Sequence, residues 1–153
     1  MTDATAEPDY DPSPTGWVRE QVDAIEAAGD TRAVSVMDRP VVLLTMRGAK
    51  SGRTKKVPLM RVEHAGVYAA VASKGGAPEH PQWFHNLLSH PDITLQDGTR
   101  SWPARARVLE EEERARWWPR CVAAYPPYAE YQERAERQIP VFVLEPLANP
   151  PQA

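Results

Sequence analysis

DITLQDGTRSWPARARVL, residues 92 to 109, is the stretch of sequence that decides the fold. Asp97-Gly98 is a preferred two-residue turn between two extended runs, so the stretch predicts a β-hairpin. After the turn, apolar and polar residues alternate, which predicts a strand with one buried face. That face contains Trp102, Ala104, Ala106 and Val108.

Four further apolar runs predict strands. Pro58 lies inside the second run, and because proline cannot donate to a strand ladder it predicts an edge strand or a bulge there. His64-Ala65-Gly66 is short enough to join the second and third runs as a hairpin. The runs are Val41–Met46, residues 57–63, Val67–Ala72 and Ile139–Leu144.

Helical spacing and stop signals predict helices between these strands. Hairpins predominate and βαβ connections are few, so the pattern predicts an α+β, mainly β fold. The sheet or barrel should be mostly antiparallel, with peripheral helices. The expected helices cover residues 17–28, a segment between Pro81 and Pro91, residues 110–124 and residues 128–137.

The chain has 153 residues, of which 42% are hydrophobic, and this is enough for one core. Residues 1–15 are rich in acids and proline, so we expect a disordered arm, followed by a single domain over 16–146 and a flexible tail over 147–153. No apolar run reaches the ~18 residues of a spanning helix. The lone Cys121 cannot form an internal disulfide and favours a cytoplasmic location.

A basic segment, Arg47–Arg61, carries six Lys or Arg residues and no acid in a chain of net charge -3. A second glycine-containing loop, Ser73–Gly76, follows another apolar run. Glycine lets backbone N–H groups approach an anion and lysine supplies charge, so the two loops together predict a site for a phosphate-bearing ligand. Each loop alone could also be a solvated turn. Nucleic acid is not expected, because the charge is confined to one stretch of an acidic protein.

Several other kinds of site are not supported. Histidines 80, 85 and 90 recur every five residues, which on a helix would make their side chains diverge, so no metal site is expected. The chain has no G-x-G-x-x-G sequence, no Walker A sequence and no nucleophile-elbow serine.

Three tyrosines recur at three-residue intervals: Tyr125, Tyr128 and Tyr131. Two prolines lie between the first tyrosine and the second. On a helix Tyr128 and Tyr131 would be neighbours. Such tyrosines can simply close the edge of a core. Alternatively, a phenol beside an electron carrier can donate a proton to a reduced substrate without needing a charged group.

Several further motifs lie between about residue 40 and residue 146. They are TMRGAKSG (45–52), PL (58–59), ASKGGA (72–77), HPQWFHNL (80–87), NLLSHP (86–91), YPPYAEY (125–131) and IPVFVLEP (139–146). Together they resemble the deazaflavin (F420)-dependent nitroreductase and quinone reductase family.

The resemblance implies a split β-barrel related to FMN-binding proteins. It also implies that reduced coenzyme F420 donates hydride to a small-molecule acceptor: a quinone, a nitroaromatic or an activated alkene. Two alternatives stay open: a non-catalytic F420 carrier, and a split barrel that binds FMN or another phosphate ligand. The oligomeric state is not specified.

By motif, the resemblance implies three groups of site residues. Tyr128 would be the catalytic proton donor. Tyr125, Tyr131 and Met60 would lie on the substrate side, although some members have tyrosine at the position of Met60. The cofactor would contact Lys50, Ser51, Gly52, Arg53, Lys55, Pro58, Ser73, Lys74, Gly75, Gly76, Gln82, Trp83 and Asn86, with Gln82 replacing a methionine of some members.

Overall fold

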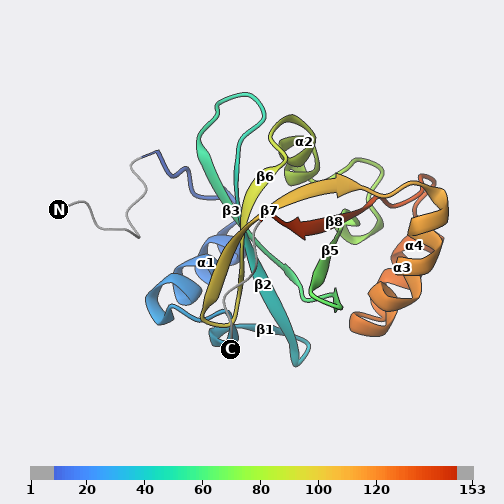
Figure 1. The fold of residues 1–153 in the computed structure, drawn as a ribbon, viewed down its shortest axis with the longest axis horizontal. Coiled ribbons are helices and arrows are strands. Elements are labelled where there is room, and N and C mark those ends of the chain that lie inside the picture. Colours follow the sequence, from blue (N-terminus) through green and yellow to red (C-terminus); the bar gives the residue numbers. More distant parts are fainter. Residues whose placement is uncertain (1–8, 148–153) are drawn as a thin grey trace.

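The computed structural model describes residues 9–147, which form a curled antiparallel sheet with helices around it (Figure 1). The strands are β1 (Ser35–Val36), β2 (Arg39–Arg47), β3 (Thr54–Met60), β4 (Glu63–His64), β5 (Val67–Val71), β6 (Asp92–Asp97), β7 (Arg100–Val108) and β8 (Val141–Pro146). They pair in the order β1-β2-β6-β7-β8-β5-β4, and β3 pairs with β2. The helices are α1 (Gly16–Ala28), α2 (Gln82–Ser89), α3 (Glu111–Ala124) and α4 (Pro127–Arg134). The predicted fold class is confirmed.

The hairpin of β6 and β7 has the predicted turn, with Gly98 at a φ of 66°. Trp102, Ala104 and Ala106 are buried as expected, but the placement of Val108 was wrong, since 40% of it is exposed. Leu109 takes the buried position, and its N–H donates to the Val141 carbonyl. The alternation therefore ends where β7 ends.

Strand β3 is an edge strand, which accounts for Pro58. It pairs with β2 in a continuous register from Thr54 opposite Arg47 to Met60 opposite Val41, without a bulge. The strand begins three residues before the predicted start because pairing with β2 continues up to the loop. Its partner, rather than its own apolar pattern, sets its length.

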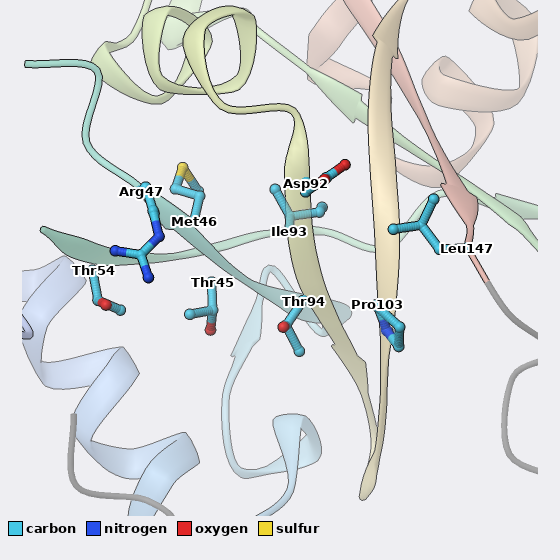
Figure 2. Close-up of a pocket in the computed structure, with 9 residues that line it drawn as sticks. All are labelled: Thr45, Met46, Arg47, Thr54, Asp92, Ile93, Thr94, Pro103 and Leu147. Carbon is cyan, nitrogen blue, oxygen red and sulfur yellow. The ribbon is translucent and has the colours of Figure 1, made fainter. Parts of the chain in front are cut away.

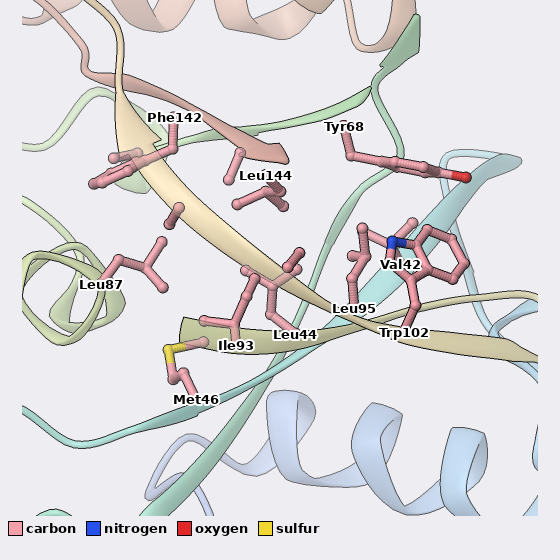
Figure 3. Packing of buried hydrophobic residues seen from close by; sticks show 14 residues of the cluster. Val42, Leu44, Met46, Tyr68, Leu87, Ile93, Leu95, Trp102, Phe142 and Leu144 are labelled. Atoms are coloured by element: carbon pink, nitrogen blue, oxygen red, sulfur yellow. The ribbon is translucent and has the colours of Figure 1, made fainter. Parts of the chain in front are cut away.

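The main core lies inside the curl of the sheet, where side chains from β2, β6, β7 and β8 meet Leu87 of α2 (Figure 3). A second cluster joins α3 and α4 to β5 and β8 around Trp117 and Cys121. A third lies on the other face of β2, where Val22 and Ile25 of α1 pack on Val41 and Leu43. The two faces of β2 are thus both covered near its start.

Residues 9–15 of the expected disordered arm have described positions. Tyr10 forms a parallel bridge with Thr54 at the start of β3, and its ring packs with the α1 cluster. Residues 1–8 and 148–153, which include the rest of the expected arm and nearly all of the expected tail, lie outside the described residues. Over residues 9–147, no helix has the length and apolar character needed to cross a membrane.

Candidate functional site

The first basic loop, residues 48–53, is a tight connection between β2 and β3. Gly48 N–H donates to the Arg53 carbonyl at 2.8 Å, and Gly52 N–H donates to the Gly48 carbonyl at 3.0 Å. Gly52 has a φ of 70°, which favours glycine, and Ser51 Oγ accepts a hydrogen bond from Arg53 N–H at 3.1 Å. These bonds fix the backbone and leave Lys50 exposed near the tip of the loop.

Asn86 of α2 connects this loop to the helix. Its Oδ1 accepts hydrogen bonds from Ala49 N–H at 2.9 Å and from Gln82 Nε2 at 3.3 Å, and the residue is buried. Because its acceptor is committed to the protein, the geometry favours a positioning role for Asn86 over direct contact with a ligand. Gln82, at the first turn of α2, is exposed.

The basic segment is largely neutralised by acids from other parts of the chain. Within residues 9–147, ion pairs join Arg47 to Asp9, Arg53 and Lys55 to Asp11, Lys56 to Glu26, and Arg61 to Asp97. Lys50 has no ion pair with a described residue. The absence of acids within the segment was therefore a poor guide to its local charge, and Lys50 is the cation best placed to receive an anion.

The second basic loop, residues 73–76, is a single 3₁₀ turn after β5. Lys74, Gly75 and Gly76 all have positive φ. A Cβ on Gly76 would lie 2.9 Å from the backbone oxygen of Tyr131, so only glycine lets the loop approach α4 this closely. Lys74 pairs with Glu79 at 3.2 Å on the surface, and Ser73 is buried.

Arg137, which the sequence analysis did not single out, holds this second loop in place. Its guanidinium donates to four backbone carbonyls and to Nδ1 of His80 at 3.1 Å. Since arginine has no acceptor, the His80 ring must carry its proton on Nε2. The carbonyls are those of Ala72 at 3.2 Å, Ser73 at 2.9 Å, Ala77 at 3.0 Å and Glu79 at 3.2 Å.

Helix α2 lies between the two loops (Figure 1). Asn86 contacts the first loop, and the ring of Phe84 stacks on His80 beside the second, with centroids 4.0 Å apart. Trp83, partly buried, packs against Phe142 of the main core with ring centroids 6.0 Å apart. The structure therefore gathers the predicted residues of both loops and of α2 around one helix.

The three tyrosines form one cluster at the start of α4. Tyr128 lies 4.9 Å from Tyr125 and 6.2 Å from Tyr131 between ring centroids, and the hydroxyls of Tyr125 and Tyr131 are 3.4 Å apart. Met60 of β3 packs against the second core cluster, which includes Tyr125 and Tyr128, and also against the α1 cluster. The three predicted tyrosines thus lie together, and Tyr131 also borders the second loop through Gly76.

The surroundings of Tyr125 and Tyr128 keep these two phenols protonated. Burial, with smaller contributions from Cys121 and the neighbouring tyrosines, raises the pKa of Tyr128 far above its ordinary value. The hydrogen bond with Tyr131, together with burial, raises the pKa of Tyr125 to about 12. No described residue accepts a hydrogen bond from Tyr128. Its proton is therefore present and not committed to a described acceptor.

Side chains along β3 point alternately to its two faces. Strand geometry places Pro58 and Met60 on one face and Lys55 on the other. Lys55 and Pro58 therefore do not point to the same side of β3. Lys56 is buried against Glu26 and Tyr10, so it faces α1 and not the first loop.

A pocket of about 320 Å³ lies elsewhere, on the face of β2, β6 and β7 opposite the main core (Figure 2). It is lined by Thr45, Met46, Arg47, Thr54, Asp92, Ile93, Thr94, Pro103 and Leu147. None of the predicted site residues lines it. Its one carboxylate, Asp92, is paired with Arg105 at 2.7 Å, so we do not assign the chemistry to this pocket.

Metal and thiol chemistry find no support in the described part of the chain. The prediction that His80 and His85 diverge was wrong, since their rings are 6.2 Å apart, because His80 precedes α2 and is not on the helix. No cluster of three metal-ligating side chains occurs among residues 9–147. Burial raises the pKa of Cys121 to about 12, so this thiol stays protonated.

Comparison with known proteins identifies the family of the chain. A sequence profile described as F420H(2)-dependent quinone reductase matches residues 17–146. The chain belongs to this family. A relative from Mycobacterium tuberculosis, the putative F420H(2)-dependent quinone reductase Rv3178, is 42% identical over 70% of the chain and 90% of its own length.

Solved structures agree with the family and the fold. The F420H2-dependent reductase FDR-A is 57% identical, with a TM-score of 0.67 over 73% of this chain and 99% of its own. HutZ, a haem storage protein of Vibrio cholerae, is only 16% identical but has a TM-score of 0.56 over 73% of this chain and 84% of its own, which shows a shared fold. The split β-barrel prediction is confirmed.

Family membership makes the chain an oxidoreductase and makes reduced F420 its hydride donor. The described residues fit such a cofactor, which carries a phosphate and a chain of glutamates. Lys50 is an exposed cation without an acidic partner, and the two glycine-containing loops flank one helix. Motifs in the sequence pointed to the candidate site residues. No motif pointed to Arg137, because the groups that accept its hydrogen bonds in the second loop are backbone carbonyls.

Proposed function

We propose that the chain transfers hydride from reduced F420 to a quinone, and that nitroaromatics and activated alkenes are accepted at the same site. The observation that carries the proposal is the position of the tyrosine cluster. It borders the second basic loop through Gly76, which lies against the backbone of Tyr131. That loop and an apolar, aromatic site for a flat acceptor are thereby adjacent.

Each part of the site has a separate task in this proposal. When bound and reduced, F420 supplies the hydride. Lys50 binds the anionic end, with Arg53, Lys55 and Lys74 adding charge that is shared with their acidic partners. Trp83 borders the ring system, while Asn86 and Arg137 keep the two loops in position.

The acceptor contacts Tyr125, Tyr131 and Met60, and Tyr128 Oη supplies a proton to the reduced acceptor. The neutral phenol adds no anion beside the cofactor before the transfer, and the phenolate that donation leaves takes a proton back from solvent. Its raised pKa keeps the proton in place at neutral pH. A cytoplasmic location, where F420 would be reduced by other enzymes, stays part of the proposal.

The decisive experiment is mixing the purified protein with F420H2 and a panel of quinones, nitroaromatics and enones, following cofactor absorbance. Acceptor-dependent oxidation is expected. Tight F420 binding without oxidation would favour a carrier. Separate titrations with F420, FMN and NADPH, followed by tryptophan fluorescence, test the cofactor itself. A preference for FMN would overturn the F420 assignment.

Ionic strength and tail length provide a further prediction. Affinity for F420 should fall as salt is added, because Lys50 and Arg53 are exposed and their interactions are screened over about 10 Å at 0.1 M salt. Affinity should rise as glutamates are added to the tail. Calorimetry at low salt with short-tailed and long-tailed F420 measures both trends. Equal affinity for the two forms would show that the loop cations are only solvated surface.

Arg137→Gln should weaken F420 binding by about tenfold, equivalent to ~1.4 kcal/mol, because the second loop loses the guanidinium that binds its carbonyls. Fluorescence titration measures this loss. Arg107→Gln is the control, since Arg107 also has hydrogen-bonded partners to lose, Glu113 and Glu145, and it lies on β7. It should lower the melting temperature without a specific loss of affinity. An equal loss of affinity in both variants would remove the positioning role of Arg137.

A further inference from the structure

The segment Asp9–Tyr10–Asp11, called the arm segment below, is attached to the free edge of β3. Asp11 N–H donates to the Thr54 carbonyl at 2.9 Å, and Thr54 N–H donates to the Asp9 carbonyl at 3.2 Å. The Thr54 hydroxyl also donates to Asp9 Oδ1 at 3.0 Å. Two backbone hydrogen bonds and a side-chain bond thus add a short parallel strand to an edge that β2 leaves open.

Tyr10 anchors this segment from the other side. Its ring packs with the α1 cluster, and the ammonium group of Lys56 lies 5.2 Å from the ring centroid. Burial raises the pKa of Tyr10, which agrees with a side chain that is held against the domain. The anchor fixes the two neighbouring aspartates on either side of Thr54.

The aspartates then pair with cations at and beside the first basic loop. Asp9 lies 3.6 Å from Arg47, and Asp11 lies 3.9 Å from Arg53 and also pairs with Lys55. The hydrogen bond from Lys55, followed by the charges of Lys55 and Arg53, lowers the pKa of Asp11, so this carboxylate is charged at neutral pH. Two carboxylates spaced along an extended backbone have the same chemistry as a stretch of oligoglutamate.

We propose that the arm segment occupies the cations that would otherwise bind the glutamate tail of the cofactor, and that Asp9 and Asp11 thereby limit the preference of the site for long tails. The inference rests on the proposed function, because it takes the first basic loop as the tail site. With the arm segment in place, Lys50 alone in that loop is without a described acidic partner, and it binds the first anionic group. A longer tail gains further contacts only by displacing Asp9 and Asp11 from Arg47, Arg53 and Lys55.

The test compares the double variant Asp9→Asn/Asp11→Asn with the wild type. The control is Glu113→Gln/Glu145→Gln, which changes net charge equally and removes the two partners of Arg107, at 2.7 Å and 3.2 Å, on a different part of the sheet. Affinity for long-tailed F420 should rise by about three- to tenfold in the arm variant, as expected from freeing exposed ion pairs. Affinity for short-tailed F420 should change less, and the control should behave as the wild type.

An unchanged ratio of long-tail to short-tail affinity in the arm variant would overturn the inference. If the wild type fails to bind any form of F420, the proposed function fails instead, and an oligoglutamate peptide then serves as the probe. Tighter peptide binding by the arm variant than by the wild type and the control supports the inference, and equal binding overturns it. In the wild type, bound peptide should also speed amide hydrogen exchange at Asp11 and Thr54, and unchanged exchange with bound peptide would contradict displacement.

Discussion

Tyr128→Phe should leave F420 affinity nearly unchanged and lower turnover of quinone by ~10², if proton donation from the phenol is part of the limiting step. Tyr128 is buried, and its ring packs on Tyr125 and Tyr131. Phenylalanine keeps these contacts and removes only the hydroxyl. Single-turnover absorbance of bound F420H2 after mixing with menadione measures the effect, with wild type and variant at equal cofactor occupancy.

The pH dependence of the rate and a second tyrosine variant serve as controls for this experiment. Because burial raises the pKa of Tyr128, the group stays protonated, so the rate that depends on Tyr128 should be flat between about pH 6 and pH 9. Tyr68→Phe is the matched control, since Tyr68 is a buried tyrosine whose hydroxyl donates to Asp97 in the main core. A loss of only a few-fold in Tyr128→Phe, similar to the control, would mean that solvent protonates the product.

Local signals in the sequence predicted the six longer strands but not β1 and β4, which have two residues each. The Asp97-Gly98 turn determines the β6–β7 hairpin because a two-residue turn depends only on its own residues and on the strands beside it. The start of β3 was missed because that boundary depends on pairing with β2 across the loop. The predicted burial of Val108 was wrong because β7 ends at this residue and Leu109 takes the buried position.

The candidate site was predicted less completely than the fold, because charge balance is a property of the folded chain. The basic segment has no acid within it, yet Asp9, Glu26 and Asp97 reach it from an arm, a helix and a distant hairpin. No pattern within residues 47–61 carries that information. Arg137 is a similar case, because its partners are backbone carbonyls, which every residue possesses.

Lys50 is the residue at which the motif and the folded charge balance agree. It is exposed in the first basic loop, and no described residue forms an ion pair with it. Lys50 therefore does not have to break an existing pair in order to bind an anion. Arg53, by contrast, lies 3.9 Å from Asp11 and would exchange one carboxylate for another.

Lys50→Ala should therefore weaken F420 binding by about 10- to 100-fold, because a hydrogen bond to a charged group contributes roughly 1.5 to 3 kcal/mol. Arg53→Ala is the matched control, and its loss should be smaller because the arginine already has a partner. Fluorescence titration gives both dissociation constants, and circular dichroism shows whether each variant is folded. Backbone bonds of the loop do not involve the Lys50 side chain, so the melting temperature should hardly change. An unchanged dissociation constant in folded Lys50→Ala, or a larger loss in Arg53→Ala, would move the anion site away from the tip of the loop and toward the cations beside the arm segment.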